Sequence, residues 1–458
     1  METIADALAI AIEHHEAGRL AQAEQMYRQI LKQQPNHLQS LHRLGMLASQ
    51  VGKHERAIPF YQKVLALAPS FAEAHFNLAC ALQNQDKIKE AIAHYQQGLT
   101  LNPNYPEVHL NFGAALKSQG CLEEAISHYQ QALTLKPNYP KAHYNLATAL
   151  LQHGDLGQGF TEYEWRWQLP HCPPRNFLKP LWDGSNLQGQ RILLHAEQGL
   201  GDTLQFIRYA PFVAQYGGYV IVECQPPLHR LLATVPGINQ LIAQGTALPQ
   251  FDVHLPLLSL PHVLGTTLET IPTQIPYLSP PESYELKLEA LPGTRLKVGI
   301  VWSGSPQNPY NRHRSLDVTH FLKLLDIPGI AFYSLQKGPR TADLVQLGDQ
   351  QRRVEDLSDR LHDFADTAAA VMQLDLVITV DTSVAHLVGA LGKPAWVLLA
   401  CDPDWRWLLG REDSPWYPSL RLFRQESLGQ WHSVFECVAE SLSTLARGNT
   451  LNRYKTPQ

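Results

Sequence analysis

The chain has 458 residues, of which 44% are hydrophobic and 17% charged, and this length predicts two or three domains with separate cores. Its 37 lysines and arginines against 42 aspartates and glutamates leave a net charge of −5, which argues against a nucleic-acid partner. The six cysteines lie far apart and form no CxxC pair, so the disulfide framework of a small secreted domain is not expected.

The N-terminal segment METIADALAIAIEHHEAG is apolar at helical spacing. It carries acids and histidines where a signal peptide would have a basic start and an unbroken apolar run. Elsewhere no uncharged apolar stretch reaches the ~20 residues that a membrane-spanning helix needs. We therefore expect a cytoplasmic protein without a transmembrane segment.

The first third of the chain repeats itself at a step of 34 residues. Prolines, tyrosines and alanines form three columns at this step, which are Pro35, Pro69, Pro103 and Pro137; Tyr27, Tyr61, Tyr95, Tyr129 and Tyr163; and Ala23, Ala57, Ala91 and Ala125. Further columns are Asn77, Asn111 and Asn145; His75, His109 and His143; and Gly45 and Gly113 alternating with Ala79 and Ala147. Chance does not give such columns.

This period and its small, aromatic and proline positions resemble the tetratricopeptide repeat, a helical hairpin that stacks into a superhelix with a concave groove. The resemblance predicts an all-α array over residues 1–169 with four full repeats and a degenerate fifth. The fifth repeat keeps Tyr163 but has Gly159 in the alanine column. It runs into WRWQLPHCPPRNFLKPLW, which we expect to cap the array.

The asparagine column has two interpretations. In the repeat array of the protein O-linked N-acetylglucosamine transferases, which this chain resembles in domain order, an asparagine ladder holds an extended polypeptide. Asn77, Asn111 and Asn145 would then form a peptide-binding groove; alternatively, they satisfy local hydrogen bonds between helices. For the histidine column we favour a hydrogen-bonded interhelical role over metal binding, because one histidine per repeat spaces the rings a repeat apart.

After residue 180 the pattern changes to short β-branched strands alternating with amphipathic segments, which predicts parallel sheets covered by helices. RILLHA and YVIVEC belong to a first lobe, and KVGIVWSG, IAFYSLQKG, LDLVITVDTS and AWVLLA belong to a second. A proline-rich interval follows from about Pro249 to Pro292, and its end, IPTQIPYLSPPESYELKLEALPG, is linker-like. Two such α/β lobes are the GT-B arrangement, and we expect lobes at 176–290 and 291–445 and a tail at 446–458.

Two strand–turn–helix motifs carry the candidate chemistry. HAEQGLGDTLQFIRYAP has Gly199 and Gly201 in a turn, followed by Asp202 at the start of a helix. DTSVAHLVGALGKP follows a buried strand, and its helix N-terminus offers free N–H groups to an anion. Together the motifs resemble glycosyltransferase family 9, which includes the lipopolysaccharide heptosyltransferases. EQGLGDTLQF, DWRWLLG and SPWYPSLRLFRQ also resemble poorly characterised bacterial proteins that join tetratricopeptide repeats to this module.

The resemblance covers roughly residues 176–445 and implies roles for single residues. It makes Asp202 the catalytic base, which would take a proton from the acceptor hydroxyl in an inverting transfer; otherwise Asp202 only caps its helix. It implies that a nucleotide-sugar donor binds at Gly199, Gly201, Asp381, Thr382, Ser383 and His386. Asp381 would contact the ribose or the sugar and Thr382 and Ser383 the pyrophosphate, unless this turn is a plain capped helix.

A basic loop lies between the two motifs. WSGSPQNPYNRHRSLD contains Arg312, His313 and Arg314, and Lys337 follows the next strand. We expect Arg314 and Lys337 to neutralise a departing diphosphate, and solvated surface charge remains an alternative for Arg312.

The pair Asp402 and Asp404 has the DxD spacing of metal-dependent transferases. We favour a structural or ribose-side role and predict no metal. Trp405 and Trp407, in the same segment, are interpreted as hinge and core residues, with stacking on a sugar ring as the alternative.

The sequence thus predicts a metal-independent glycosyltransferase with no cofactor beyond a UDP- or ADP-linked sugar as co-substrate. It would act on a hydroxyl acceptor, which a protein held by the repeats could carry. The alternative is a catalytically silent scaffold, since repeats alone imply only partner recruitment. Protein O-N-acetylglucosaminylation is less favoured, because the motifs match family 9 more closely.

Overall fold

The computed structural model describes residues 3–282, 286–289, 293–307, 311–427 and 429–448. The chain forms two compact units. The first comprises Met1–Ala149 and Gln168–Cys172, and the second comprises Leu150–Trp167 and Pro173–Gln458. This division differs from the boundary expected after residue 169, because the last helical segment of the fifth repeat packs with the α/β part. Most of the expected tail lies outside the described residues.

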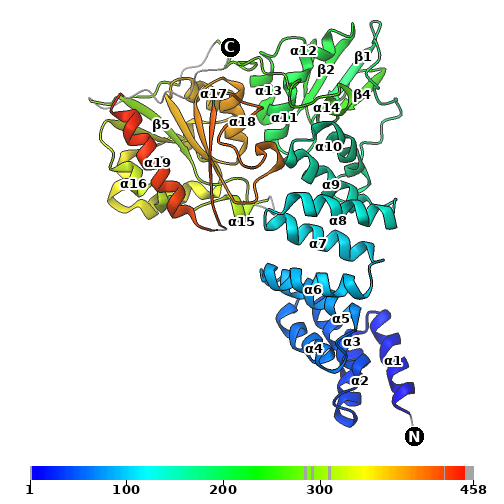
Figure 1. The fold of residues 1–458 in the computed structure, drawn as a ribbon. Helices are drawn as coiled ribbons and strands as arrows, with labels where there is room; N and C mark the ends of the chain where they lie inside the picture. Colours follow the sequence, from blue (N-terminus) through cyan, green and yellow to red (C-terminus); the bar gives the residue numbers. More distant parts are fainter. Residues whose placement is uncertain (1–2, 283–285, 290–292, 308–310, 428, 449–458) are drawn as a thin grey trace. The chain divides into compact units, whose positions relative to one another are not determined.

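The first unit is a stack of helical hairpins in sequence order (Figure 1). Its helices are α1 (Ile4–Glu16), α2 (Leu20–Gln33), α3 (Leu38–Gln50), α4 (His54–Leu67), α5 (Ala72–Gln83), α6 (Ile88–Leu101), α7 (Pro106–Ser118), α8 (Leu122–Leu135) and the first part of α9 (Pro140–His153). The predicted all-α array is confirmed.

The repeat columns form the contacts within each hairpin. The alanine and tyrosine columns are buried, with Tyr27 and Tyr95 fully inaccessible to solvent. A Cβ added at Gly45 would lie 2.6 Å from the ring of Tyr61, and one added at Gly113 would lie 2.6 Å from the ring of Tyr129. The small position therefore lets the first helix of a hairpin approach the tyrosine of the second.

The second unit begins with the end of α9, then α10 (Leu156–Tyr163) and the 3-10 turn η1 (Glu164–Gln168). Its first sheet contains β1 (Arg191–His195), β2 (Tyr219–Cys224), β3 (Gln240–Ala243) and β4 (Val253–Pro256), all parallel in the order β3-β2-β1-β4. Its helices are α11 (Leu200–Phe206), α12 (Ala210–Ala214), α13 (Pro226–Leu232) and α14 (Leu260–Val263), with 3-10 turns η2 (Ile207–Tyr209) and η3 (Leu257–Ser259).

The second sheet is also parallel and has the order β10-β9-β8-β5-β6-β7. Its strands are β5 (Leu296–Val301), β6 (Ile330–Ser334), β7 (Val354–Asp356), β8 (Leu376–Val380), β9 (Ala395–Leu399) and β10 (Leu420–Arg424). Its helices are α15 (Asn311–Arg314), α16 (Leu322–Leu325), α17 (Phe364–Met372), α18 (Ser383–Ala390) and α19 (Trp431–Ala446). The remaining 3-10 turns are η4 (Val318–Phe321), η5 (Pro339–Arg353), η6 (Ser358–Arg360) and η7 (Trp405–Trp407).

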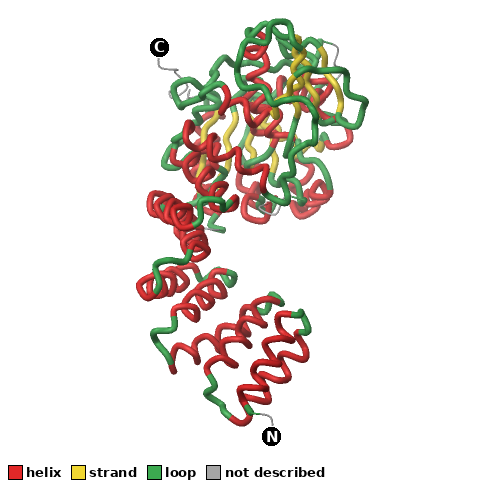
Figure 2. Tube along the Cα trace, turned by 90° about the vertical axis from the view of Figure 1, so that its right-hand side faces the viewer, coloured by secondary structure: helices red, strands yellow, loops and turns green. Residues whose placement is uncertain are grey.

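Figure 2 shows the strands of the α/β unit in yellow among the helices that flank them. Residues of the strands and of these helices together form the hydrophobic core of the second sheet. Phe321 before α16 and Phe435 of α19 pack together and join a cluster with strand residues such as Ile300 and Ile378. Helix α18 packs on β8 and β9 and also lies beside α11, which belongs to the first sheet (Figure 1). The α11–α18 contact therefore joins the two halves of the unit.

The predicted parallel α/β region is confirmed. One of its strands was not predicted, because Val253–Pro256, inside the proline-rich interval, forms β4 and pairs with β1. All residues of β4 are buried, and α14 follows it. Four residues carry too little pattern to stand out among prolines. No helix within the described ranges is long and apolar enough to span a bilayer.

Candidate functional site

The glycine turn after β1 starts helix α11 and holds Asp202 in its first turn. Gly199 is the N-cap residue, and its backbone N–H donates to Asp202 Oδ2 at 2.8 Å. Asp202 therefore stabilises the start of its own helix from position N3, whereas the structural interpretation of this motif placed it at the N-cap, which is Gly199. The interaction uses one oxygen of the carboxylate and leaves the other for a second partner.

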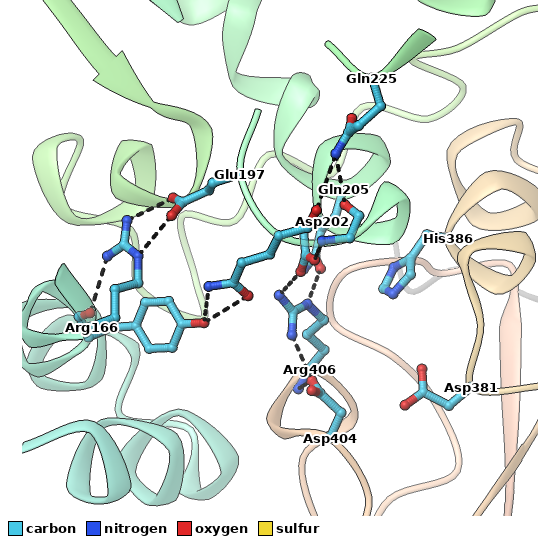
Figure 3. A network of polar contacts seen from close by, with 12 residues as sticks. Arg166, Glu197, Asp202, Gln205, Gln225, Asp381, His386, Asp404 and Arg406 are labelled. Atoms are coloured by element: carbon cyan, nitrogen blue, oxygen red, sulfur yellow. Dashed lines mark hydrogen bonds and ion pairs between the residues drawn. The ribbon is translucent and has the colours of Figure 1, made fainter. Parts of the chain in front are cut away.

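That partner is Arg406, in the segment after β9. Its guanidinium forms a short ion pair with Asp202 Oδ1, and it donates to Asp404 Oδ1 at 2.9 Å and to Gln205 Oε1 at 2.7 Å. The guanidinium carbon lies 4.2 Å from the ring centre of Trp405. Arg406 thus connects a carboxylate beside the first sheet with one beside the second (Figure 3).

Burial and the charge of Arg406 act in opposite directions on the pKa values of Asp202 and Asp404. Burial raises the pKa of Asp202 above the usual range, while the neighbouring Arg406 charge opposes that rise. The pKa of Asp404 is lowered because the Arg406 charge and hydrogen bonds outweigh the effect of burial. A buried arginine between two carboxylates is held by its partners, and removing it would leave both carboxylates without a counter-charge.

Asp381 lies directly after β8, at the turn into α18. Thr382 is the N-cap residue, and its hydroxyl is 3.0 Å from that of Thr379. Asp381 is 8% exposed, and one carboxylate oxygen is 3.8 Å from Arg314 Nη1. Burial and then the nearby Asp404 carboxylate raise the pKa of Asp381 to about 6, with Arg314 opposing the rise. Asp381 can therefore gain or lose a proton near neutral pH.

His386 lies on the first turn of α18, near Asp202 and Arg406 (Figure 3). Its Nδ1 is 3.0 Å from the Tyr417 hydroxyl, and its ring stacks on Trp407 at 5.4 Å between ring centres. Burial and then the Arg406 charge lower the pKa of His386 to about 3, so the imidazole is neutral. A Cβ at Gly201 would lie 2.8 Å from His386 Cδ2, so this glycine permits the close approach of α11 to α18.

The structure brings together most of the site residues predicted in the second unit. The site around Arg406 contains Asp202, Gly201, Asp381 and His386, and α18 begins beside it with Thr382 and Ser383. Lys337 is not among them, because its Nζ donates to the Ser358 carbonyl at 2.6 Å. The side chain of Arg312 lies outside the described part.

Arg314 belongs to the site through its approach to Asp381 and through Gly304. A Cβ at Gly304 would lie 2.8 Å from Arg314 Nη2, so the guanidinium rests on this glycine's backbone. The buried Nε of Arg314 has no hydrogen-bond partner among the described residues. This cation therefore keeps a donor for which the described structure supplies no acceptor.

Sequence reasoning did not identify Arg406 as a site residue, although its motif DWRWLLG was noted. It also missed Arg166, which is fully buried and donates to Glu197 at 2.8 Å and to Ser259 Oγ at 2.8 Å. Glu197 and Gln198 precede Gly199, and Gln198 exchanges hydrogen bonds with Tyr163. Residues of the degenerate fifth repeat thus hold the turn that leads to Asp202 (Figure 3).

The arrangement provides carboxylates that can accept a proton and guanidinium groups that can neutralise negative charge. The carboxylates of Asp202 and Asp404 bind the guanidinium of Arg406. Asp381 is paired with Arg314 and lies near enough for the charges of Asp404 and Arg406 to act on its pKa. Within the described residues, no cluster of three or more histidine, cysteine or acidic side chains is arranged to hold a metal ion. Asp402, the other acid of the DxD pair, lies 3.4 Å from the Gln152 amide.

The asparagine column bonds within the array. Asn77 Nδ2 is 2.9 Å from His42 Nε2, and Asn111 Nδ2 donates to Cys80 Sγ at 3.5 Å. Each bond reaches the first helix of the preceding repeat, as the local interpretation expects. Asn145 occupies the next position, half-buried on α9. Peptide binding by this column stays a prediction.

Comparison with known proteins identifies the first unit. Models described as tetratricopeptide repeat match residues 3–70 and 60–93, and one described as TPR repeat matches 85–120 and 113–154. The repeats are therefore tetratricopeptide repeats, as predicted. Protein FlbA of Caulobacter vibrioides is 27% identical over 292 residues, 58% of this chain and 48% of that protein. The chain spans about half the length of this curated relative.

Solved structures are similar to this chain over a little more than a third of its length. The MamA crystal structure is 24% identical, covers 36% of this chain and 91% of its own, and has a TM-score of 0.34. MamA from Desulfovibrio magneticus RS-1, residues 41 to the end, is 19% identical, with coverages of 38% and 97% and a TM-score of 0.34. YrrB, described as a TPR protein with an unusual peptide-binding site, is 18% identical, with coverages of 37% and 88% and a TM-score of 0.33.

Proposed function

We propose that the second unit transfers a sugar from a nucleotide-sugar donor to a hydroxyl acceptor, by a metal-independent and inverting mechanism in a GT-B fold. The repeats form a scaffold for protein–protein interaction, and they would present the acceptor or a recruiting partner. The observation that carries the proposal is the group around Arg406, where Asp202 from the first half meets Asp381 and His386 from the second.

Asp202 is the proposed base. One of its oxygens accepts from Arg406 and the other from Gly199, yet a carboxylate has about four lone-pair sites, so it can still accept a proton. Arg406 keeps the carboxylate ionised, while burial raises the pKa and so strengthens the base. The acceptor hydroxyl would give its proton to Asp202 as it attacks the anomeric carbon.

Donor binding is proposed at the start of α18. Its first turn presents backbone N–H groups and a positive dipole end to a diphosphate. Arg314 stands 3.8 Å from Asp381 and has an unpartnered buried Nε, so it can supply charge to the leaving group. Asp381, protonated or not near neutral pH, would accept from or donate to a ribose or sugar hydroxyl.

A second function is supported by the same contacts. The Asp202–Arg406–Asp404 ion pairs also join the two halves of the unit as a structural element would. A chain that kept them for stability alone would be a binding scaffold without turnover.

A donor screen distinguishes these functions. The full chain is tested with UDP- and ADP-linked sugars for a rise in melting temperature and for donor hydrolysis. We expect Asp381→Asn to abolish the thermal shift, and Asp202→Asn to keep it while turnover falls by a factor of 100 or more, on the order of 10²–10⁴ for a general base. Asp349→Asn, at an exposed position, is the matched control. Binding of no donor by the folded wild type would favour the scaffold.

A further inference from the structure

Two successive repeats contain a pair of facing histidines. His75 of α5 lies with Nδ1 at 3.1 Å from Nδ1 of His94 in α6, and His109 of α7 lies with Nδ1 at 3.0 Å from Nδ1 of His128 in α8. Each pair joins the two helices of one hairpin, and the second pair follows the first by one repeat. The histidine column His75, His109 and His143 contains only the first member of each pair.

Backbone carbonyls fix the tautomer of the first histidine. His75 Nε2 is 2.9 Å from the Pro69 carbonyl oxygen, and His109 Nε2 is 2.9 Å from that of Pro103. A carbonyl oxygen only accepts, so each Nε2 carries the hydrogen and each Nδ1 presents a lone pair. A hydrogen bond from Nε2 to a carbonyl is also the usual support of a histidine that ligates a metal through its other nitrogen.

The spacing of the two Nδ1 atoms matches a metal chelate. Two nitrogens at about 2.1 Å from a metal, in neighbouring positions at 90°, are about 3.0 Å apart. The observed separations are 3.1 and 3.0 Å. His94 and His128 are only half-buried, so the remaining coordination positions can be filled from solvent. We propose that each histidine pair binds one divalent transition-metal ion, such as Ni²⁺ or Cu²⁺, through its two Nδ1 atoms.

The hydrogen bonds of the pairs suit this role, because each first histidine already has its Nε2 bonded to a backbone carbonyl and its Nδ1 directed at the facing ring. Without metal, the second ring donates its Nδ1 hydrogen to the first. On binding, that proton moves to Nε2 of the same ring, which frees Nδ1 and leaves the pair neutral. Imidazole nitrogen is a preferred ligand of Ni²⁺ and Cu²⁺.

Calorimetric titration of the full chain with Ni²⁺ at pH 7 tests the proposal. We expect His94→Gln and His128→Gln each to bind one equivalent less than wild type, and the double variant to bind two less. His362→Gln, at an exposed position outside the repeats, should bind as wild type does. The proposal is overturned if the folded double variant binds as much Ni²⁺ as wild type.

A second measurement needs no variant. The ring of Phe112 contacts that of His128, with ring centres 4.3 Å apart and planes tilted by 42°. Paramagnetic Ni²⁺ at the second pair should therefore broaden the NMR signals of a labelled Phe112 ring when two equivalents have been added to wild type. Sharp Phe112 signals at that point would exclude this pair as the site. Neither measurement depends on glycosyl transfer.

Discussion

Arg406 is a buried cation that joins polar side chains from both halves of the second unit. It is 6% exposed, and its guanidinium interacts with Asp202, Asp404 and Gln205. Burying an ion pair stabilises little by itself, because desolvation offsets the attraction. Removing one partner is different, since the remaining charges then stay buried without compensation.

Arg406→Met should therefore destabilise the second unit by ~3–5 kcal/mol, because Asp202 and Asp404 lose their counter-charge. Urea unfolding monitored by tryptophan fluorescence measures the change. Arg411→Met removes a comparable pair with Asp413, whose side chain is 69% exposed, and should shift the midpoint little. Equal midpoints for the two variants would mean that Arg406 is not a main support of the unit.

The residues next to Arg406 in the sequence do not predict that it belongs to the site. Asp202 and Asp381 each stand in a strand–turn–helix pattern, and such turns collect at the carboxyl edge of a parallel sheet, which made both residues predictable. Arg406 lies in a short 3-10 turn among tryptophans, and its partner Asp202 is about two hundred positions away. Lys337 shows the reverse, because a favourable position after a strand did not place its amine at the site.

At the scale of elements, the hairpins of the array could be predicted because each repeat restates the same local pattern. A proline, a small residue and a tyrosine recur at fixed offsets, and the small residue packs against the tyrosine. Short strands such as β4 have no second copy to confirm them. The histidine pairs could be predicted only in part. The column of His75 and His109 is evident in the sequence, whereas their partners His94 and His128 on the facing helices are identified only by the structure.

The histidine pairs should make the array sensitive to acid. The pKa of His128 is about 4 in the folded chain against an ordinary value of 6.5, so the unfolded chain binds a proton more readily. The contribution of neutral His128 to the free energy of unfolding is therefore fully present above pH 6.5. It is lost as the pH drops from 6.5 toward 4. Because His128 is partly exposed, we reduce the expected effect: acidification from pH 7 to pH 5 should lower the free energy of unfolding by ~1 kcal/mol through this residue.

Melting curves of the metal-free chain at pH 7 and pH 5 measure this contribution. The wild-type melting temperature of the array should fall on acidification, and His128→Gln should reduce that fall by about 2–4 °C because its side chain does not titrate. His362→Gln should leave the fall unchanged. An undiminished fall in His128→Gln would show that other groups cause the acid sensitivity.

At the scale of the whole molecule, the boundary between the units follows packing rather than the repeat period. Helix α10 keeps the repeat's Tyr163, yet Phe160 packs against Trp405, with ring centres 5.6 Å apart, and Arg166 binds Glu197. The period shows that a hairpin is present but does not show which surface its second helix covers. For this reason the sequence indicated a boundary at 169, whereas residues 150–167 belong to the α/β unit.

This division predicts the behaviour of fragments. A fragment 140–458 keeps α10 and η1, whereas a fragment 176–458 leaves Glu197 buried without Arg166, and its carboxylate already has a pKa raised by burial. We expect 176–458 to be less stable by ~3–5 kcal/mol and to be cleaved faster by a protease in limited proteolysis. A fragment 106–458 adds α7 and α8 of the first unit and should unfold its α/β part at the same temperature as 140–458. If 176–458 matched both, the Arg166–Glu197 contact would be dispensable, and the fifth repeat would belong to the array alone.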